Sequence, residues 1–166
     1  MIDLHSHSTA SDGEFSPSEL VALAIEKNVN VLALTDHDTF DGIEEGKQAA
    51  KNKNITFIPG IELNIQRSRG EFHLLGLGIK EPSTNLIKIC KELQEGRLSR
   101  NQQIIEKMQQ DGFPVNYQEL KEMFPTQILG RPHLAAYLVE KKVVKKRQLA
   151  FDKYLGKGRP YYVERR

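Results

Sequence analysis

Residues 1–13 read MIDLHSHSTASDG, and this stretch indicates both the fold and the site. A short apolar alternation, typical of a β-strand, carries His5 and His7 at its end. Side chains two residues apart in a strand point to the same face, roughly 7 Å apart along the chain, so both imidazoles can bind one metal ion. Asp12 follows in the next turn, directly before a glycine. A lone histidine is more often a surface or core residue, but this in-phase pair with its acid–glycine turn predicts a metal site.

The composition is that of one globular domain. Of the 166 residues, 39% are hydrophobic and 28% are charged. The start of the chain lacks the basic and apolar regions of a signal peptide, and no apolar run reaches the length of about eighteen residues typical of a membrane span. Cys90 is the single cysteine, which excludes an internal disulfide. We therefore expect a cytoplasmic protein with no membrane association.

The two halves of the chain carry opposite charge. Residues 1–80 have a net charge of −5, whereas residues 81–166 have a net charge of +7. An acidic, histidine-bearing half suits cations, and a basic half suits phosphates or nucleic acid. Two differently solvated surfaces would give the same totals, so charge alone leaves both interpretations open.

Strands and helices alternate in the first part of the chain, which predicts an α/β fold with a parallel or mostly parallel sheet. A helix should start at Ser16-Pro17 with Glu19 completing a capping box, and a second helix should be capped by Asp41. The predicted strands are the opening run, 31–35, 55–63 and 72–79.

From about residue 83 the pattern becomes helical. A long helix is predicted over 84–110, terminated by Gly112. Two shorter helices should begin at Asn116 and Gly130, and a last, basic helix should cover 145–155. This gives three predicted parts, which are a barrel-like part over 1–82, a helical insertion over 83–155 and a return segment over 156–166.

Six candidate metal ligands lie at or just beyond the ends of predicted strands. They are His5, His7, Asp12, His37, Glu62 and His73. The carboxyl ends of parallel strands form one face of such folds, so four separate segments should deliver these side chains to one place. Nitrogen and oxygen ligands without cysteine suit Mn²⁺, Fe²⁺ or Zn²⁺.

The motifs HSHSTASDG, TDHD and GIEL, with the histidine of FHLLG, resemble successive motifs of the PHP (polymerase and histidinol phosphatase) superfamily. The resemblance implies a distorted seven-stranded β/α barrel that hydrolyses phosphoesters with two or three divalent metal ions, with Mn²⁺ the first expectation. Asp12, where many members have histidine, and the helical insertion resemble the branch that acts on nucleoside 3′,5′-bisphosphates and 5′-phosphorylated RNA. Metal-activated water would then attack a phosphorylated nucleotide or short RNA.

The resemblance also implies how the ligands divide among the metals. The two histidines of the opening strand would bind the first metal, and Glu62 would bridge it to a second metal that His73 also holds. Asp12 and His37 would bind the third. Asp36 and Asp38 flank a ligand and are expected to orient imidazoles, although Asp38 is equally well explained as a cap or turn residue.

Four residues of the basic half are candidate substrate ligands. Arg97 and Arg100 fall on the apolar stripe of the long helix, where an anion such as a substrate phosphate would pair them, unless that helix leaves the core and exposes them. Arg131 and His133 lie at a predicted helix N-terminus, which favours anions. The basic run over 141–147 either contacts an RNA backbone or is a solvated face.

The resemblance stops before the end of the chain. The family completes its site with later ligands, two of them histidines, and this sequence has no histidine after His133. We therefore expect a truncated barrel with an exposed sheet edge and an exposed apolar face, feeble or absent turnover by residues 1–166 alone, and room for a partner chain or oligomer at the incomplete barrel. The alternatives to a phosphoesterase are a catalytically impaired metal- or nucleic-acid-binding remnant and an enzyme similar to histidinol phosphatase.

Overall fold

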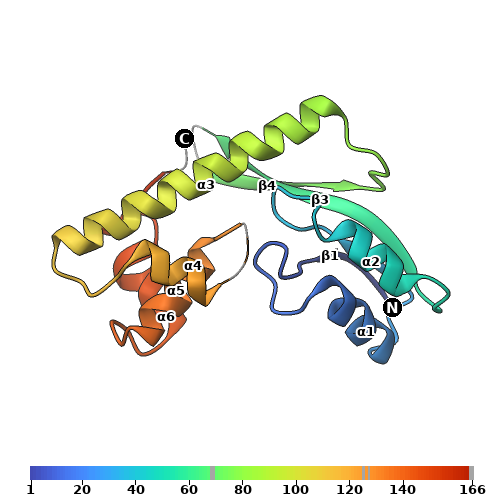
Figure 1. Cartoon of the computed structure of the whole chain (residues 1–166), viewed down its shortest axis with the longest axis horizontal. Coiled ribbons are helices and arrows are strands. Elements are labelled where there is room, and N and C mark those ends of the chain that lie inside the picture. The colour runs from blue at the N-terminus through green and yellow to red at the C-terminus, as the bar shows by residue number, and fades with distance from the viewer. Residues whose placement is uncertain (68–69, 125, 127, 165–166) are drawn as a thin grey trace. The chain divides into compact units, whose positions relative to one another are not determined.

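A curled four-stranded sheet, with strand order β1-β2-β3-β4, forms the centre of the first half of the chain (Figure 1). In this computed structural model, which describes residues 1–67, 70–124, 126 and 128–164, the chain divides into two units, 1–94 and 95–166. The sheet consists of β1 (Ile2–Ser6), β2 (Val31–Leu34), β3 (Thr56–Arg67) and β4 (Gly70–Leu77). Helices α1 (Pro17–Glu26) and α2 (Ile43–Ala50) connect the parallel strands. The expected α/β class is therefore confirmed.

Strand β3 changes its pairing partner halfway along its length. Its first residues pair in parallel with β2, ending at the pair Leu34–Pro59, and Gly60 begins the antiparallel ladder with β4. The predicted strand over 55–63 is thus longer than expected, and Pro59-Gly60 marks the exchange of partners. A side chain at position 60 would lie 2.8 Å from the carbonyl oxygen of Gly76, so glycine lets the two backbones approach closely.

The two helix starts of the first unit differ in how well the sequence predicts them. Ser16 and Glu19 form the expected capping box, with the Ser16 hydroxyl accepting from the Glu19 N–H and the Glu19 carboxylate accepting from the Ser16 N–H. The predicted cap at Asp41 is wrong, because α2 begins one residue later with Gly42 as N-cap and no side-chain cap. A Cβ at position 42 would lie 3.0 Å from a carboxylate oxygen of Asp36, so this close approach explains the glycine.

Helix α3 (Thr84–Gln110) spans the boundary between the units and ends as predicted, with Gly112 in the left-handed conformation (φ +81°). The predicted boundary at residue 82 stays a prediction. The second unit continues with α4 (Tyr117–Met123), α5 (Arg131–Glu140), α6 (Arg147–Ala150) and the π-helix η1 (Phe151–Leu155). The last predicted helix is thus an α-helical turn followed by π-helix, in which Gly156 N–H donates to the Phe151 carbonyl.

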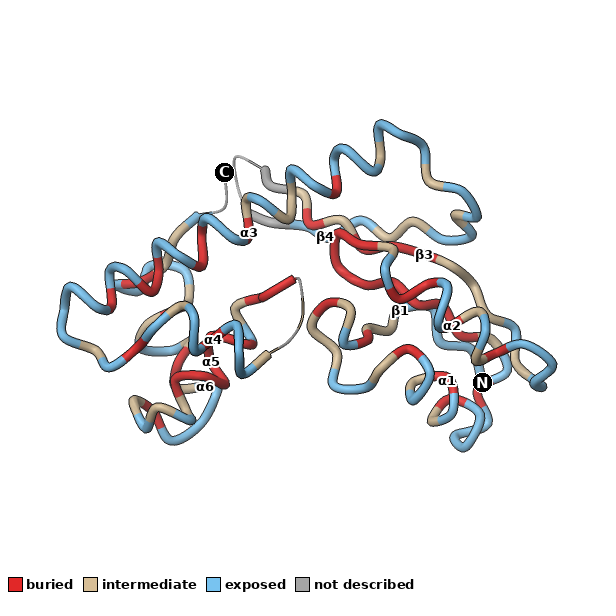
Figure 2. Tube along the Cα trace, in the orientation of Figure 1, coloured by how far each residue is buried: buried red, intermediate tan, exposed pale blue. Residues whose placement is uncertain are grey.

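Each unit has its own hydrophobic core, and Figure 2 shows buried residues in both units. The core of the first unit includes Val21 and Ala24 of α1, Leu32 of β2 and Ala50 of α2. The larger core lies in the second unit and includes Ile104, Met108, Leu120, Leu134, Leu138 and Leu155. In the first unit, apolar side chains of the outer strands remain exposed, among them Ile2 and Leu74. This agrees with the expected exposed sheet face. Among the helices of the described residues, none has both the length and the apolar character required to cross a bilayer.

Candidate metal centre

All six predicted ligands come together in the first unit. They are His5, His7, Asp12, His37, Glu62 and His73, and they form three overlapping groups whose ligand atoms lie within 4.8 Å of one another. The end of β1, the loop that follows it, the segment after β2, and strands β3 and β4 each contribute. The six side chains thus converge as expected, and their role as metal ligands stays a prediction.

Glu62 is the centre of this cluster. Its side chain is 1% exposed, and Oε2 lies 2.9 Å from both His5 Nε2 and His7 Nε2 and 3.6 Å from His37 Nδ1. Oε1 forms a hydrogen bond with His73 Nδ1. The backbone fixes the position, because Asp38 N–H donates to the Glu62 carbonyl and Glu62 N–H donates to the Asp36 carbonyl. One buried carboxylate thus contacts all four imidazoles of the unit.

Asp12 approaches the same imidazoles from the other side. Its carboxylate oxygens lie 3.5 Å from His7 Nδ1 and 3.7 Å from His37 Nε2. The turn that brings it there needs Gly13, since a Cβ at that position would overlap the carbonyl oxygen of His7. The sequence pair Asp12-Gly13 is therefore a candidate ligand followed by the glycine that folds it back onto the preceding strand.

The donor set fits divalent cations. His7 and His37 each present both ring nitrogens to carboxylate oxygens. A neutral imidazole has a single N–H, so one nitrogen of each ring would turn a lone pair toward negative oxygen. Cations between nitrogen and oxygen remove this repulsion, and nitrogen and oxygen ligands suit Mn²⁺, Fe²⁺ and Zn²⁺ alike.

Electrostatics also keep Glu62 ionised. Burial raises the pKa of Glu62, but the hydrogen bond with His5 and the electrostatic interactions with the imidazoles of His37, His7 and His73 outweigh burial, so the pKa is lowered overall. An ionised carboxylate at the centre of the cluster is the form that binds metal.

Asp36 anchors the loop that carries two ligands. This buried carboxylate accepts hydrogen bonds from Ser8 N–H (2.7 Å), Ser8 Oγ (2.6 Å) and Ser11 Oγ (2.6 Å). Burial raises the pKa of Asp36 although the serine hydrogen bonds act against it. We expected Asp36 to orient imidazoles, but within the described part of the chain its hydrogen bonds go to the serine loop. It therefore acts on His7 and Asp12 through their backbone.

Asp38 is linked to a ligand through Asn64, a residue that the sequence did not single out. Asp38 is buried with φ +55°, and its Oδ1 accepts from the Asn64 N–H at 3.3 Å. The Asn64 side-chain nitrogen lies 3.2 Å from His73 Nε2. Asn64 could have been predicted from its spacing to Glu62, because residues two apart in a strand place their side chains on one face of β3.

The four candidate substrate residues lie in the second unit. Arg97 is 5% exposed and Arg100 4%, so the alternative of two solvated arginines is wrong, although Ile89 on the same predicted stripe is 45% exposed. The Arg100 guanidinium donates to Asn101 Oδ1, and Asn101 in turn donates to the Leu129 carbonyl.

Helix α5 begins with the other two candidates. His133 Nδ1 accepts from the Gly130 N–H at 2.9 Å, so the neutral ring carries its proton on Nε2. The His133 ring packs edge-on against Phe124, with centroids 4.9 Å apart. The Arg131 guanidinium lies 5.5 Å from the ring centroid of Tyr162. These contacts fix both side chains, and the stacking of Arg131 on Tyr162 was not predicted.

Comparisons with known proteins agree with this geometry. The model of the PHP domain family matches residues 3–164. Over 98% of its length the chain is 38% identical to a 5′-3′ exoribonuclease of Haemophilus influenzae and 35% identical to a 3′,5′-nucleoside bisphosphate phosphatase of Chromobacterium violaceum. It covers 59% and 57% of those two proteins, so it spans less than two thirds of their length.

Solved structures show the same fold. A Chromobacterium violaceum structure described as an amidohydrolase with sulfate bound superimposes with a TM-score of 0.90 at 35% identity, covering 98% of this chain and 58% of the other. A structure described as a metal-dependent phosphoesterase of Bifidobacterium adolescentis gives a TM-score of 0.89 at 27% identity, covering 99% and 58%. The four-stranded sheet thus matches part of a PHP-type barrel, and the chain belongs to the PHP domain family.

Proposed function

We propose that this protein is a metal-dependent phosphoesterase that hydrolyses nucleoside 3′,5′-bisphosphates or short 5′-phosphorylated RNA. The observation that carries the proposal is the convergence of four imidazoles and the carboxylate of Asp12 around the buried Glu62. The names of the Haemophilus influenzae and Chromobacterium violaceum relatives support this substrate class.

The roles of the candidate ligands follow from how far each side chain is exposed. When bound, divalent metal ions supply an acidified water and neutralise charge on the phosphoryl oxygens. Glu62 is buried and holds the centre, whereas the side chains of His5 and His73 are 49% and 43% exposed and form the accessible side of the cluster. Asp36 and Asn64 keep the ligand loop and His73 in place. We assign Mn²⁺ as the metal, with Zn²⁺ and Fe²⁺ as alternatives.

We further assign recognition of the substrate phosphate to Arg97, Arg100, Arg131 and His133. The two arginines lie on α3, and a guanidinium presents a fork of donors that matches a phosphate bidentately. His133 has its ring fixed by Gly130, which leaves Nε2–H as the donor. Charge-assisted hydrogen bonds from such groups are the strong way to hold phosphate.

A second candidate function is a metal- or nucleic-acid-binding protein with impaired catalysis. It is favoured by the exposed apolar residues of β1 and β4, such as Ile2 and Leu74. On this alternative a partner chain or a second copy would complete the sheet.

The test is release of inorganic phosphate from adenosine 3′,5′-bisphosphate with added Mn²⁺. The wild-type chain should release phosphate, and Glu62→Gln should release it at least tenfold more slowly. Glu26→Gln, a matched change at a side chain that is 69% exposed, should keep full activity. Metal binding without phosphate release would favour the second candidate. Equal activity of the two variants would contradict the central role of Glu62.

A further inference from the structure

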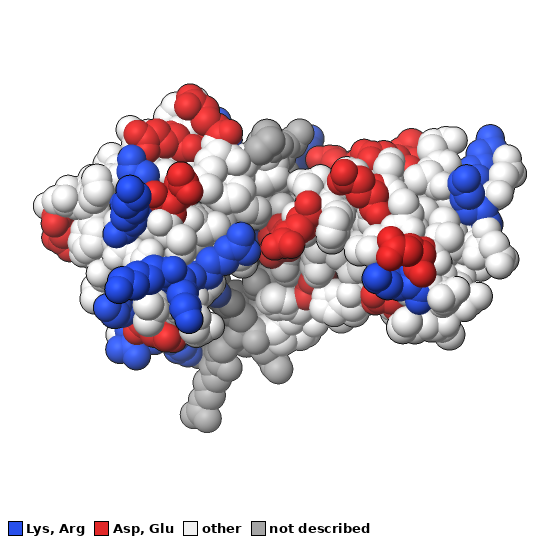
Figure 3. All heavy atoms as spheres, turned by 90° about the horizontal axis from the view of Figure 1, so that it is seen from below, with Lys and Arg blue, Asp and Glu red and all other residues white. Residues whose placement is uncertain are grey.

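Residues 141–160 form a strongly basic segment that the metal centre does not explain. This segment contains eight Lys or Arg and a single acid, Asp152, which gives it a net charge of +7 against +2 for the whole chain. Six of its exposed cations, which do not include Arg147, define what we call the basic surface: Lys142, Lys145, Lys146, Lys153, Lys157 and Arg159. Figure 3 shows Lys and Arg side chains gathered on one face of the unit 95–166.

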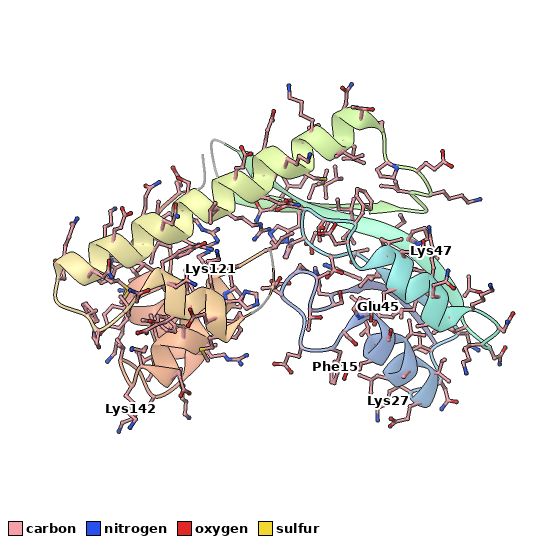
Figure 4. All side chains as sticks on the ribbon, viewed as in Figure 1. Phe15, Lys27, Glu45, Lys47, Lys121 and Lys142 are labelled. Atoms are coloured by element: carbon pink, nitrogen blue, oxygen red, sulfur yellow. The ribbon has the colours of Figure 1, made fainter. Side chains whose placement is uncertain are left out.

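The fold turns these charges outward. Val144, Ala150 and Leu155 lie between the basic residues and are buried in the core of the second unit, so they hold the segment against the helices. Left-handed residues at Lys142 (φ 57°) and Gly158 (φ +76°) turn the backbone at its two ends. Figure 4 shows Lys142 pointing away from the unit.

The charges of the basic surface are not neutralised within the part of the chain that the structure describes. Lys141, next to this surface, forms an ion pair with Glu119 at 2.9 Å, but the six cations of the basic surface have no such pair there. The single acid of the segment accepts a hydrogen bond from Gln148 instead. The basic surface therefore keeps its counterions in solution, where a polyanion can displace them.

The chemistry of the basic surface favours a nucleic-acid backbone over a protein or a membrane. A protein interface usually has an apolar core, and an interfacial helix inserts apolar side chains into lipid. Among the described residues, the large hydrophobic side chains that are exposed all lie outside 141–160. Lysines on flexible stems are suited to phosphates that need charge rather than fixed geometry.

We infer that the basic surface binds the phosphate backbone of single-stranded RNA, independently of base sequence. The choice of RNA rests on the proposed function, and it adds that RNA longer than a single nucleotide gains affinity from a second part of the molecule. This affinity should fall steeply with salt, because each phosphate contact releases counterions.

The test compares two triple variants of the full chain by fluorescence anisotropy. Lys142→Gln/Lys145→Gln/Lys146→Gln removes half of the basic surface, and Lys47→Gln/Lys51→Gln/Lys53→Gln removes the same charge from the first unit, where Figure 4 labels Lys47. The probe is a 5′-phosphorylated oligoadenylate of about twelve nucleotides, titrated from about 50 to 200 mM NaCl. Circular dichroism checks the fold, and Lys145→Gln/Lys153→Gln/Lys157→Gln is the substitute if the first variant misfolds.

The first variant should bind the probe at least tenfold more weakly at low salt, and the slope of log K against log salt should flatten by about 2, or about 0.7 per lost phosphate contact. The control variant should bind like the wild type. Equal binding by all three proteins, or loss of the same size in the control, would overturn the inference, as would binding to phosphatidylserine vesicles without binding to RNA.

Hydrolysis of adenosine 3′,5′-bisphosphate, measured in parallel, separates this inference from the proposed function. If phosphate is released but the first variant still binds RNA like the wild type, the inference that the basic surface binds RNA is wrong and the proposed function stands. If no phosphate is released but RNA binding depends on the basic surface, the inference stands and the proposed function falls.

Discussion

Replacing Asp36 with alanine should loosen the metal centre without removing a ligand. Asp36 accepts three hydrogen bonds from Ser8 and Ser11, in the loop between the ligands His7 and Asp12. Hydrogen bonds to a charged group contribute about 1.5–3 kcal/mol each when one partner is deleted, and they do not add fully. The loop also keeps its own bonds from Ser11 and Gly13 N–H to the Ser8 carbonyl. We therefore expect a loss of about 3 kcal/mol in the free energy of unfolding.

The same change should weaken binding of Mn²⁺ by about 10- to 100-fold, which is typical when the residues that support metal ligands are removed. Asp36→Asn keeps one acceptor oxygen, so it should cost only about 1 kcal/mol. Urea unfolding measures the first effect, and competition with a fluorescent chelator measures the second. Asp41→Ala is the matched control, because Asp41 is exposed five residues later. The reasoning is refuted if Asp36→Ala unfolds and binds Mn²⁺ like Asp41→Ala.

Three further changes test other parts of the account. Gly13→Ala should destabilise the chain by about 1–3 kcal/mol and weaken Mn²⁺ binding in the chelator assay, since its Cβ overlaps the His7 carbonyl; unchanged binding would contradict this. Tyr137→Phe should cost about 1–2 kcal/mol in urea unfolding at pH 7, because the buried hydroxyl bonds Asn116 N–H and Glu119. Burial and the hydrogen bond to Glu119 raise the pKa of Tyr137 to about 12. The stability that the hydroxyl contributes is therefore full below the unfolded-state pKa of about 10 and is lost as the pH rises through 12. If the difference in unfolding free energy between the wild type and Tyr137→Phe does not shrink over that range, the assignment is refuted. Asn64→Ala should lower the affinity for Mn²⁺, because the Asn64 side chain contacts His73, while Asn52→Ala should not. An equal effect of the two changes would show that Asn64 does not support the metal centre.

The ligands of the metal centre could be predicted from the sequence because they follow a simple rule. Histidines and carboxylates at the ends of parallel strands converge, and His5 and His7 at the end of β1 obeyed this rule. Glu62 and His73 lie within β3 and β4 instead, and the antiparallel pairing of these strands brings them to the same place. The start of α1, with its complete capping box, and the end of α3, with a left-handed Gly112, could also be predicted.

The supporting contacts were not readable, because they join residues far apart in sequence. The bond from Ser8 to Asp36 spans 28 residues, and nothing in TDHD separates an aspartate that bonds serines from one that orients imidazoles. Gly42 is explained by the approach of α2 to that same carboxylate, which only the fold reveals. Local pattern alone also could not show that β3 exchanges partners at Pro59-Gly60, because register depends on the neighbouring strands.

The most direct test of the central claim is the number of Mn²⁺ ions bound by the wild-type chain and by Glu62→Gln, measured by electron paramagnetic resonance of free Mn²⁺ during titration. The three overlapping groups of ligands predict that the wild type binds more than one ion. Because Glu62 contacts all four imidazoles, Glu62→Gln should lose at least one of these ions, while Glu26→Gln should lose none. A wild-type chain that binds no Mn²⁺, Zn²⁺ or Fe²⁺, or a Glu62→Gln variant that binds as many ions as the wild type, would contradict the claim.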